Sequence, residues 1–227
     1  MRGRSVERCG LFCAGRDMSQ TSDAVEHLQA WCRENDIVWH ERATERFEQY
    51  IDLILRYQKQ TNLTGFSTAS GLVDNMIVDS LQIVRVMTPV GPLVDVGSGA
   101  GFPAMPLKIL FPDVEMHLVE PRTKRYAFLG LVVRSLGLDS ISVHGERIEN
   151  AGIKSVRTAI SKAFAPPAVW LETCLAWARD GAQVAGYFSL SDYEALLGSL
   201  DEKGWCVKAK YQQEQRVYVL LVQQNHE

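Results

Sequence analysis

The sequence lacks the features that would place it in a membrane or in an oxidising compartment. No apolar run approaches the roughly 20 residues that span a bilayer, and the apolar patch near the N-terminus is too short for the core of a signal peptide. The 5 cysteines are odd in number and scattered, and none forms a CxxC pair, which indicates reduced thiols rather than disulfides or a zinc site. We therefore expect a cytoplasmic protein with no membrane partner and no metal.

An excess of positive charge is also absent. The formal net charge is -3 at pH 7, so any binding to nucleic acid must come from a local basic face. One such segment runs from residue 121 to residue 138 without an acidic residue and contains Arg122, Lys124, Arg125 and Arg134. It is either a solvated helix face or a surface that contacts RNA phosphates, and both interpretations stay open.

The remaining pattern predicts three regions. Residues 1–20 have no periodicity and are expected to form a disordered leader, with Met18 as an alternative start. Residues 21–90 form a helical region, in which apolar residues recur at three- and four-residue spacing and a further helix is expected over residues 70–86. Residues 91–227 form the third region, the main domain.

In that third region short apolar strands alternate with helical segments. This alternation predicts an α/β fold with a doubly wound, mostly parallel sheet. The last two strands, within 205–211 and 216–223, have no helix between them and should form an antiparallel hairpin at one edge. A chain of 227 residues is long enough to bury one good core.

The first predicted strand runs directly into the glycine turn "DVGSGAGFP", residues 95–103. Ligands of doubly wound sheets bind at the carboxyl ends of the strands, so a ligand is expected at this turn. The dinucleotide fingerprint G-x-G-x-x-G does not fit, because Gly101 comes one residue early and Phe102 takes the fingerprint position. Asp95 would repel a pyrophosphate and suits a cationic ligand.

The pattern D-x-G-x-G-x-G resembles motif I of the class I S-adenosylmethionine-dependent methyltransferases. Glu120 ends the second predicted strand. In the dinucleotide-binding fold and in the class I methyltransferase fold alike, an acidic residue at this place binds the ribose hydroxyls. S-adenosylmethionine is thus the expected cofactor, while a dinucleotide and a turn without a ligand remain alternatives. The cofactor residues expected from this turn and the second strand are Asp95, Gly97, Ser98, Gly99, Gly101, Phe102, Glu120 and Pro121.

Longer segments of the sequence indicate which methyltransferase family the chain resembles. "YIDLILRYQKQTNLTGFS", "MIVDSLQIV", "DVGSGAGFPAMPLKILFPD" and "ISKAFAP" follow one another as in the glucose-inhibited division protein B family, over roughly residues 23–222. That family methylates guanine N7 in small-subunit (16S) ribosomal RNA. The resemblance implies that Gly97 and Phe102 line the cofactor pocket, that Ile148 and Glu149 lie near the adenine, and that Asn62 lies near the site entrance.

The chain departs from the family in three places. Asn75-Met76 replaces an Arg-His pair, Lys162 replaces an arginine, and Tyr187-Phe188 replaces a Lys-Gly pair. An arginine and a lysine are not equivalent where a planar, bidentate contact is needed. We therefore expect methyl transfer to be kept, whereas the identity of the RNA target is in question. A methyltransferase acting on a small molecule or a protein is therefore the second hypothesis.

Methylation at guanine N7 removes no proton, so no general base is expected. Lys162 and Arg147 are candidates for contacts to the substrate or to the cofactor carboxylate, and Asn62 for holding a base edge. Each has a simpler interpretation: a solvated lysine at a strand end for Lys162, an ion pair with Glu146 or Glu149 for Arg147, and a helix cap or turn residue for Asn62. His144, with no second histidine close by in the sequence, is interpreted as structural.

The partner expected from the resemblance is 16S rRNA or the small ribosomal subunit, and a monomer is the default expectation. A non-catalytic binding module is disfavoured by the intact turn and by Glu120. An NAD-dependent oxidoreductase is disfavoured by the early third glycine and by Phe102.

Overall fold

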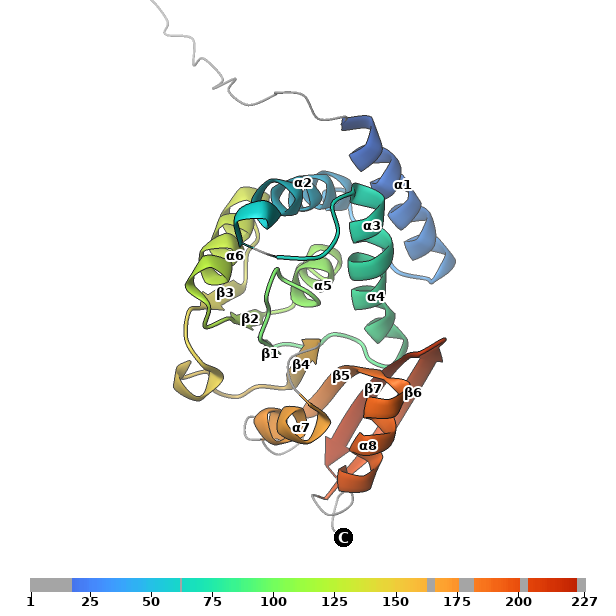
Figure 1. Ribbon diagram of the computed structural model, residues 1–227, viewed down its shortest axis with the longest axis vertical. Helices are drawn as coiled ribbons and strands as arrows, with labels where there is room; N and C mark the ends of the chain where they lie inside the picture. The colour runs from blue at the N-terminus through green and yellow to red at the C-terminus, as the bar shows by residue number, and fades with distance from the viewer. Residues whose placement is uncertain (1–17, 62, 163–165, 176–181, 201–203, 224–227) are drawn as a thin grey trace, which may run out of the picture.

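The computed structural model describes residues 18–61, 63–162, 166–175, 182–200 and 204–223, and all structural statements concern these ranges. Within them a seven-stranded sheet has the order β3-β2-β1-β4-β5-β7-β6 (Figure 1). The strands are β1 Leu93–Val96, β2 Met116–Val119, β3 Ile141–His144, β4 Thr158–Lys162, β5 Gln183–Ser189, β6 Trp205–Gln213 and β7 Arg216–Gln223. The first five are parallel, and β7 pairs antiparallel with both β5 and β6. The predicted fold class, including the edge hairpin, is confirmed.

Helices cover both faces of the sheet, and each face has its own apolar core (Figure 1). Along β1 the side chains alternate, so that Leu93 joins one core while Val94 and Val96 join the other. The first core includes α5 (Ala104–Leu110), α6 (Thr123–Leu136) and the N-terminal helices. The second includes η3 (Ile148–Asn150), α7 (Pro167–Leu175) and α8 (Leu190–Leu200).

The N-terminal helices begin with α1 (Met18–Glu34) and α2 (Ala43–Thr61). The predicted leader is therefore corrected at its last three residues, because residues 18–20 are helical; residues 1–17 lie outside the described ranges. The helix expected over residues 70–86 is present, and it changes type along its length. It consists of α3 (Ala69–Leu72), the π-helical turn η1 (Val73–Ile77), α4 (Val78–Leu81) and the 3-10 turn η2 (Gln82–Arg85).

Helix α2 connects the N-terminal region to the main domain through three hydrogen bonds from two of its side chains. The buried Tyr50 hydroxyl donates to the carbonyl of Ala100 at 2.9 Å. Arg46 donates to the carbonyls of Leu136 and Gly137, where α6 ends at Gly137 in the left-handed conformation. Because α2 thus holds both the glycine turn and the end of α6, the N-terminal helices are part of the scaffold of that turn.

Two further observations bear on the predictions from composition. Cys32, Cys174 and Cys206 are free thiols, and the other two cysteines lie outside the described residues. None of the helices in the described ranges combines the length and hydrophobicity needed for a membrane span.

The packing around Gly101 yields a stability prediction. A Cβ atom there would lie 2.5 Å from Met105 Cγ and 3.0 Å from the Tyr50 hydroxyl, at a φ of +103°. Overpacking and backbone strain should together lower the free energy of unfolding of Gly101→Ala by about 2 to 4 kcal/mol, measured in urea. The matched control is Gly198→Ala in α8, where a Cβ meets nothing within 4 Å. The control should gain stability, and a Gly101→Ala protein as stable as wild type would contradict the packing described.

Candidate active site

The glycine turn leaves the carboxyl end of β1, where the chain order of the sheet reverses between β1 and β4. Gly97, Gly99 and Gly101 have φ values of +74°, +59° and +103°, a region that residues with a Cβ rarely adopt. The amides of Gly97 and Ser98 donate to the carbonyl of Val119 at 2.9 and 3.1 Å, so the turn is closed over the end of β2. Glycine at these three positions is therefore a requirement of the backbone.

Glu120 is buried beside this turn and holds it in place. One carboxylate oxygen accepts from the Gly99 amide at 3.0 Å, and the other accepts from the Arg122 amide at 2.8 Å. A phosphate would need such amides as its own donors. Because a carboxylate already occupies the Gly99 amide, the geometry disfavours a pyrophosphate and agrees with the sequence argument against a dinucleotide.

Asp95 lies under the turn and is fully buried. Neither of its carboxylate oxygens has a hydrogen-bond partner in the described part of the chain. Burial raises the pKa of Asp95 to about 7. The Ser98 hydroxyl, which donates to the Asp95 backbone carbonyl at 3.0 Å, and the Ala104 amide lie close enough to oppose this rise without a hydrogen bond to the carboxylate, and the charge of Glu120 adds to it. A buried carboxylate without a partner favours a cation as its ligand, so these residues fit a positively charged nucleoside.

Phe102, which follows the turn, packs inward. Its side chain is buried, with its ring centroid 5.6 Å from that of Tyr50 and 5.8 Å from the ammonium nitrogen of Lys162. A direct contact between Phe102 and a cofactor stays a prediction.

Lys162 ends β4 and is not a solvated lysine. Its side chain is only 8% exposed, and its Nζ lies 2.5 Å from Oδ2 of Asp79, whose side chain is 11% exposed. Burial lowers the pKa of Lys162, whereas the charge and hydrogen bonding of Asp79 raise it. The solvated alternative for Lys162 is therefore wrong. Asp79, which the sequence analysis did not single out, is its partner.

The remaining predicted residues are more dispersed. Ile148 is buried in η3, in the second core, whereas Arg147, Glu149 and Pro121 are exposed. No ion pair joins Arg147 to Glu146 or Glu149 among the described side chains, so that simpler interpretation gains no support. Asn62 lies outside the described residues, and its predicted role is untested.

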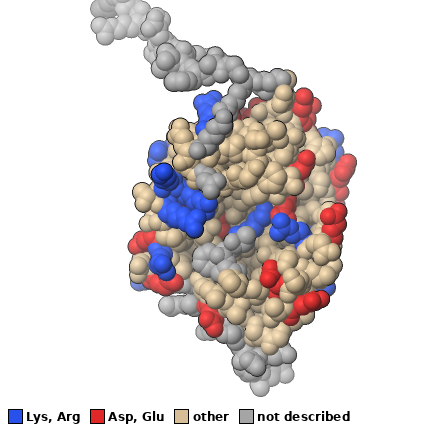
Figure 2. Space-filling view, viewed as in Figure 1, with Lys and Arg blue, Asp and Glu red and all other residues tan. Residues whose placement is uncertain are grey.

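The predicted basic residues lie together along α6 and at its start. Arg122, Lys124 and Arg134 are exposed, and Arg125 is half-buried. On the face shown in Figure 2, Lys and Arg side chains gather over α6. Since Glu120 binds the amide of Arg122, this basic face borders the glycine turn directly.

The structural role of His144 stays a prediction, but its premise is wrong, because a second histidine lies close to it in space. His117 Nδ1 lies 3.2 Å from His144 Nε2, because parallel pairing of β2 with β3 makes the two residues diagonal neighbours on one face. Burial and the neighbouring His117 lower the pKa of His144, while Glu146 opposes this. In the described ranges no three His, Cys, Asp or Glu side chains come together as a metal site, so the pair joins two strands.

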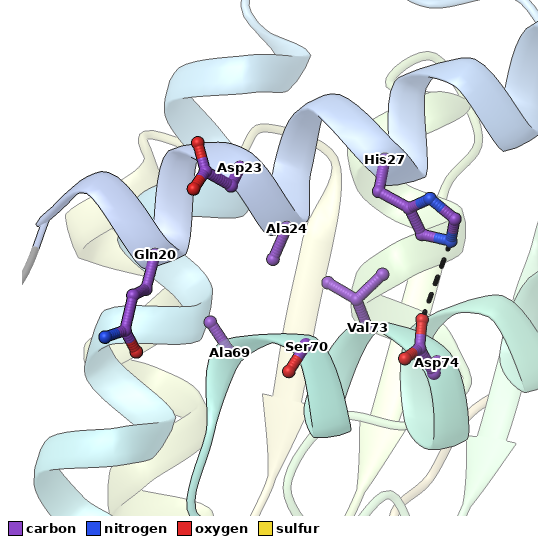
Figure 3. A pocket seen from close by; sticks show the side chains of 8 residues that line it. All are labelled: Gln20, Asp23, Ala24, His27, Ala69, Ser70, Val73 and Asp74. Carbon is purple, nitrogen blue, oxygen red and sulfur yellow. Dashed lines mark ion pairs between the residues drawn. The ribbon is translucent and has the colours of Figure 1, made fainter.

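Two surface cavities lined by described residues lie away from the glycine turn. One lies between α1 and the α3–η1 segment, where His27 Nε2 is 3.8 Å from Asp74 Oδ1 (Figure 3). The other lies between the loop after α1 and the loop after α5. Neither is lined by a residue of the turn or by Glu120.

The buried Asp95 predicts an unusual pH dependence of stability. Its pKa is about 7 when folded, against an ordinary value of 3.8, so the folded state prefers the neutral acid. The stability that Asp95 contributes is complete below about pH 4 and is lost as the pH rises towards 7. The asparagine of Asp95→Asn is neutral at every pH. In urea unfolding without ligand, the free energy of unfolding of this variant minus that of wild type should therefore increase by up to about 4 kcal/mol between pH 4 and pH 8. The exposed Asp23→Asn serves as the control, and a gap for Asp95→Asn that does not change with pH would refute this assignment.

Solved structures support the fold. A ribosomal protein L11 methylase from Lactobacillus delbrueckii superposes with a TM-score of 0.55 at 12% identity, over 70% of this chain and 81% of that chain. A fibrillarin from Aeropyrum pernix, solved with natively bound S-adenosyl-L-methionine, superposes with a TM-score of 0.53 at 15% identity, over 64% and 74%. At these identities the likeness concerns the fold, which is the class I methyltransferase fold predicted above.

Sequence relatives identify the family. The profile of the family described as rRNA small subunit methyltransferase G matches residues 43–198. A ribosomal RNA small subunit methyltransferase G from Wolinella succinogenes is 34% identical over 169 residues, which cover 74% of this chain and 84% of that protein. One from Geobacillus kaustophilus is 32% identical over 176 residues, covering 74% of each. The resemblance found in the sequence and the predicted use of S-adenosylmethionine are thereby confirmed, and the chain belongs to the rRNA small subunit methyltransferase G family.

Proposed function

We propose that this protein transfers the methyl group of S-adenosylmethionine to N7 of a guanine in 16S rRNA. The observation that carries the proposal is the fully buried, unpartnered Asp95 carboxylate under a turn that Glu120 holds closed. Relatives named ribosomal RNA small subunit methyltransferase G support the class of substrate. The protein would then act in the cytoplasm, as a monomer, on the small ribosomal subunit.

The residues in and around the glycine turn each have a role in this proposal. Asp95 faces the cationic part of the ligand, Glu120 accepts from ribose hydroxyls, and Gly97 and Gly99 allow close approach of the backbone. Ile148 would border the adenine, with Glu149 beside it. When bound, S-adenosylmethionine supplies a methyl group on a positively charged sulfur.

The residues of the chain then have to position a base. Guanine N7 has an in-plane lone pair and loses no proton on methylation, so no residue needs to act as a general base. Orientation alone can supply roughly 7–11 kcal/mol of barrier reduction. A base in structured RNA must first leave its stack and be held at its edge. Lys162, at the end of β4 beside Phe102, is the described residue best placed for this, and Arg147 and Asn62 remain candidates.

A second candidate function keeps the cofactor and changes the substrate. Tyr187 and Phe188, which replace a Lys-Gly pair of the family, are both buried. Tyr187 donates to the carbonyl of Ser80 at 2.6 Å, and Phe188 packs edge-on against Trp170. The cationic group that the family presents here is thus replaced by core packing, which favours an altered substrate contact.

Mapping of methylated guanines in 16S rRNA tests the proposal. We expect a strain without this gene to lose one N7-methylguanine, and the wild-type gene to restore it. Gly97→Asp should not restore it, because Gly97 has a φ of +74° and an added carboxylate would fill the turn. If every N7-methylguanine persists in the deletion strain, the rRNA assignment fails and the second candidate gains.

The basic face along α6 yields a prediction for substrate binding. Replacing the exposed Arg122 and Lys124 together by alanine should raise KM for small ribosomal subunits by roughly 5- to 30-fold and reduce its salt dependence. The affinity for S-adenosylmethionine should stay within about twofold. The control combines Arg157→Ala, just before the amino end of β4, with Lys208→Ala on the edge strand β6, which removes the same charge from exposed positions elsewhere. An equal effect in both double variants would show that α6 is no specific RNA surface.

A further inference from the structure

The ion pair between Asp79 and Lys162 joins α4 to the end of β4, and two tyrosines hold the α4 side of it. The Tyr218 hydroxyl donates to Oδ1 of Asp79 at 2.6 Å, and the Tyr187 hydroxyl donates to the carbonyl of Ser80 at 2.6 Å. Residues 79 and 80 are therefore fixed from β7 and β5 at once. Buried ion pairs add little net stability, so stability alone does not account for this arrangement.

The helix is also irregular just before Asp79. The π-helical turn over residues 73–77 precedes α4, and the Ser80 hydroxyl donates to the carbonyl of Met76 at 2.5 Å. Lys162 Nζ lies 3.4 Å from the same carbonyl. Single π turns inside helices occur frequently at functional sites. Here the turn brings a helix carbonyl and a carboxylate to one ammonium group.

The ammonium group lies close to the glycine turn. Its nitrogen is 5.8 Å from the ring centroids of both Phe102 and Tyr187. Ile160 in β4 pairs with Asp95 in β1, so Lys162 extends two residues beyond that pair, towards the edge of the sheet where the turn lies. Lys162 and the turn therefore lie at the same edge of the sheet.

We propose that Asp79 is a positioning residue, whose carboxylate holds the Lys162 ammonium beside Phe102. One of the two N–H donors that make long contacts to the Met76 carbonyl (3.4 Å) and the Ser80 hydroxyl (3.5 Å) then turns to O6 of the target guanine. This inference rests on the proposed function. O6 and N7 lie on the same edge of guanine, so one donor at O6 fixes the position of N7. A free lysine has many rotamers, and the carboxylate removes that freedom before the substrate arrives.

Asp79 also favours the charged form of Lys162, which is the stronger hydrogen-bond donor. Burial and the charge of Arg216 lower the pKa of Lys162, while Asp79 raises it. Besides Asp79 on α4, the titratable or charged groups around the ammonium are Tyr187 on β5 and Tyr218 and Arg216 on β7. Without the carboxylate the pKa should fall further, so the variant should lose the charged form at a lower pH than wild type.

The test compares Asp79→Asn with wild type in methyl transfer to small ribosomal subunits from a strain lacking the gene. We expect kcat to fall about 10-fold or more at pH 9 and less at pH 6.5, with an unchanged KM for S-adenosylmethionine. Asp74→Asn, on the same helical segment with a side chain 55% exposed, is the matched control and should behave like wild type. A defect in folding alone would lower the stability of the variant and its yield of folded protein, so kcat is expressed per folded protein at each pH.

A second variant separates charge from shape. Lys162→Arg carries a guanidinium that stays charged at all working pH values. Combined with Asp79→Asn, it should remove the loss of kcat at high pH. In parallel, an NMR titration of the Lys162 side-chain nitrogen should show a pKa at least one unit lower in Asp79→Asn than in wild type, with Lys162→Arg identifying the signal.

The outcomes are distinguishable. Wild-type kcat and pH profile in Asp79→Asn, or an unchanged Lys162 titration, would overturn the proposal. If the wild-type protein transfers no methyl group to small ribosomal subunits, the proposed function fails. The NMR titration would still decide whether Asp79 controls the pKa of Lys162. If Asp79→Asn does not fold, Tyr218→Phe removes only the hydroxyl that holds Asp79, and it should lower kcat about fivefold. An unchanged kcat in that variant would also contradict the positioning role.

Discussion

The buried carboxylate of Asp95 is the feature that determines which ligand the candidate site can bind. The fold buries it completely under a tight turn and gives it no hydrogen-bond partner within the described residues. An arrangement of this kind reduces stability near neutral pH, and a cationic ligand would relieve it. The cost is understandable if the position serves binding, since strain and uncompensated charge concentrate at functional sites.

The N-terminal helices complete this site. Tyr50 on α2 reaches the turn at Ala100, and Asp79 on α4 reaches Lys162 at the end of β4. Both contacts join the helical region to the carboxyl edge of the parallel strands, where ligands of this fold bind. The region that begins as a separate helical pattern in the sequence is thus built into the candidate site, and it shares one apolar core with α5 and α6.

The sequence predicted those features that depend on local pattern. Strand–helix alternation gave the parallel sheet, and the spacing of Gly97, Gly99 and Gly101 located a turn whose positive φ values require glycine. Contacts between distant segments were not predictable in the same way. Tyr218 and Asp79 are 139 residues apart in the sequence. The π turn before Asp79 has no residue pattern that distinguishes it from an ordinary α-helix. His117 and His144 likewise meet only because β2 pairs with β3.

Binding calorimetry with the ligand-free protein tests the central claim most directly. The account predicts that S-adenosylmethionine binds with one site per chain and that NAD gives no signal under the same conditions. Replacement of Glu120 by glutamine should weaken the binding, since Glu120 holds the turn through the Gly99 and Arg122 amides and, in the proposed function, accepts from the ribose hydroxyls. Clear binding of NAD with no response to S-adenosylmethionine would contradict the account.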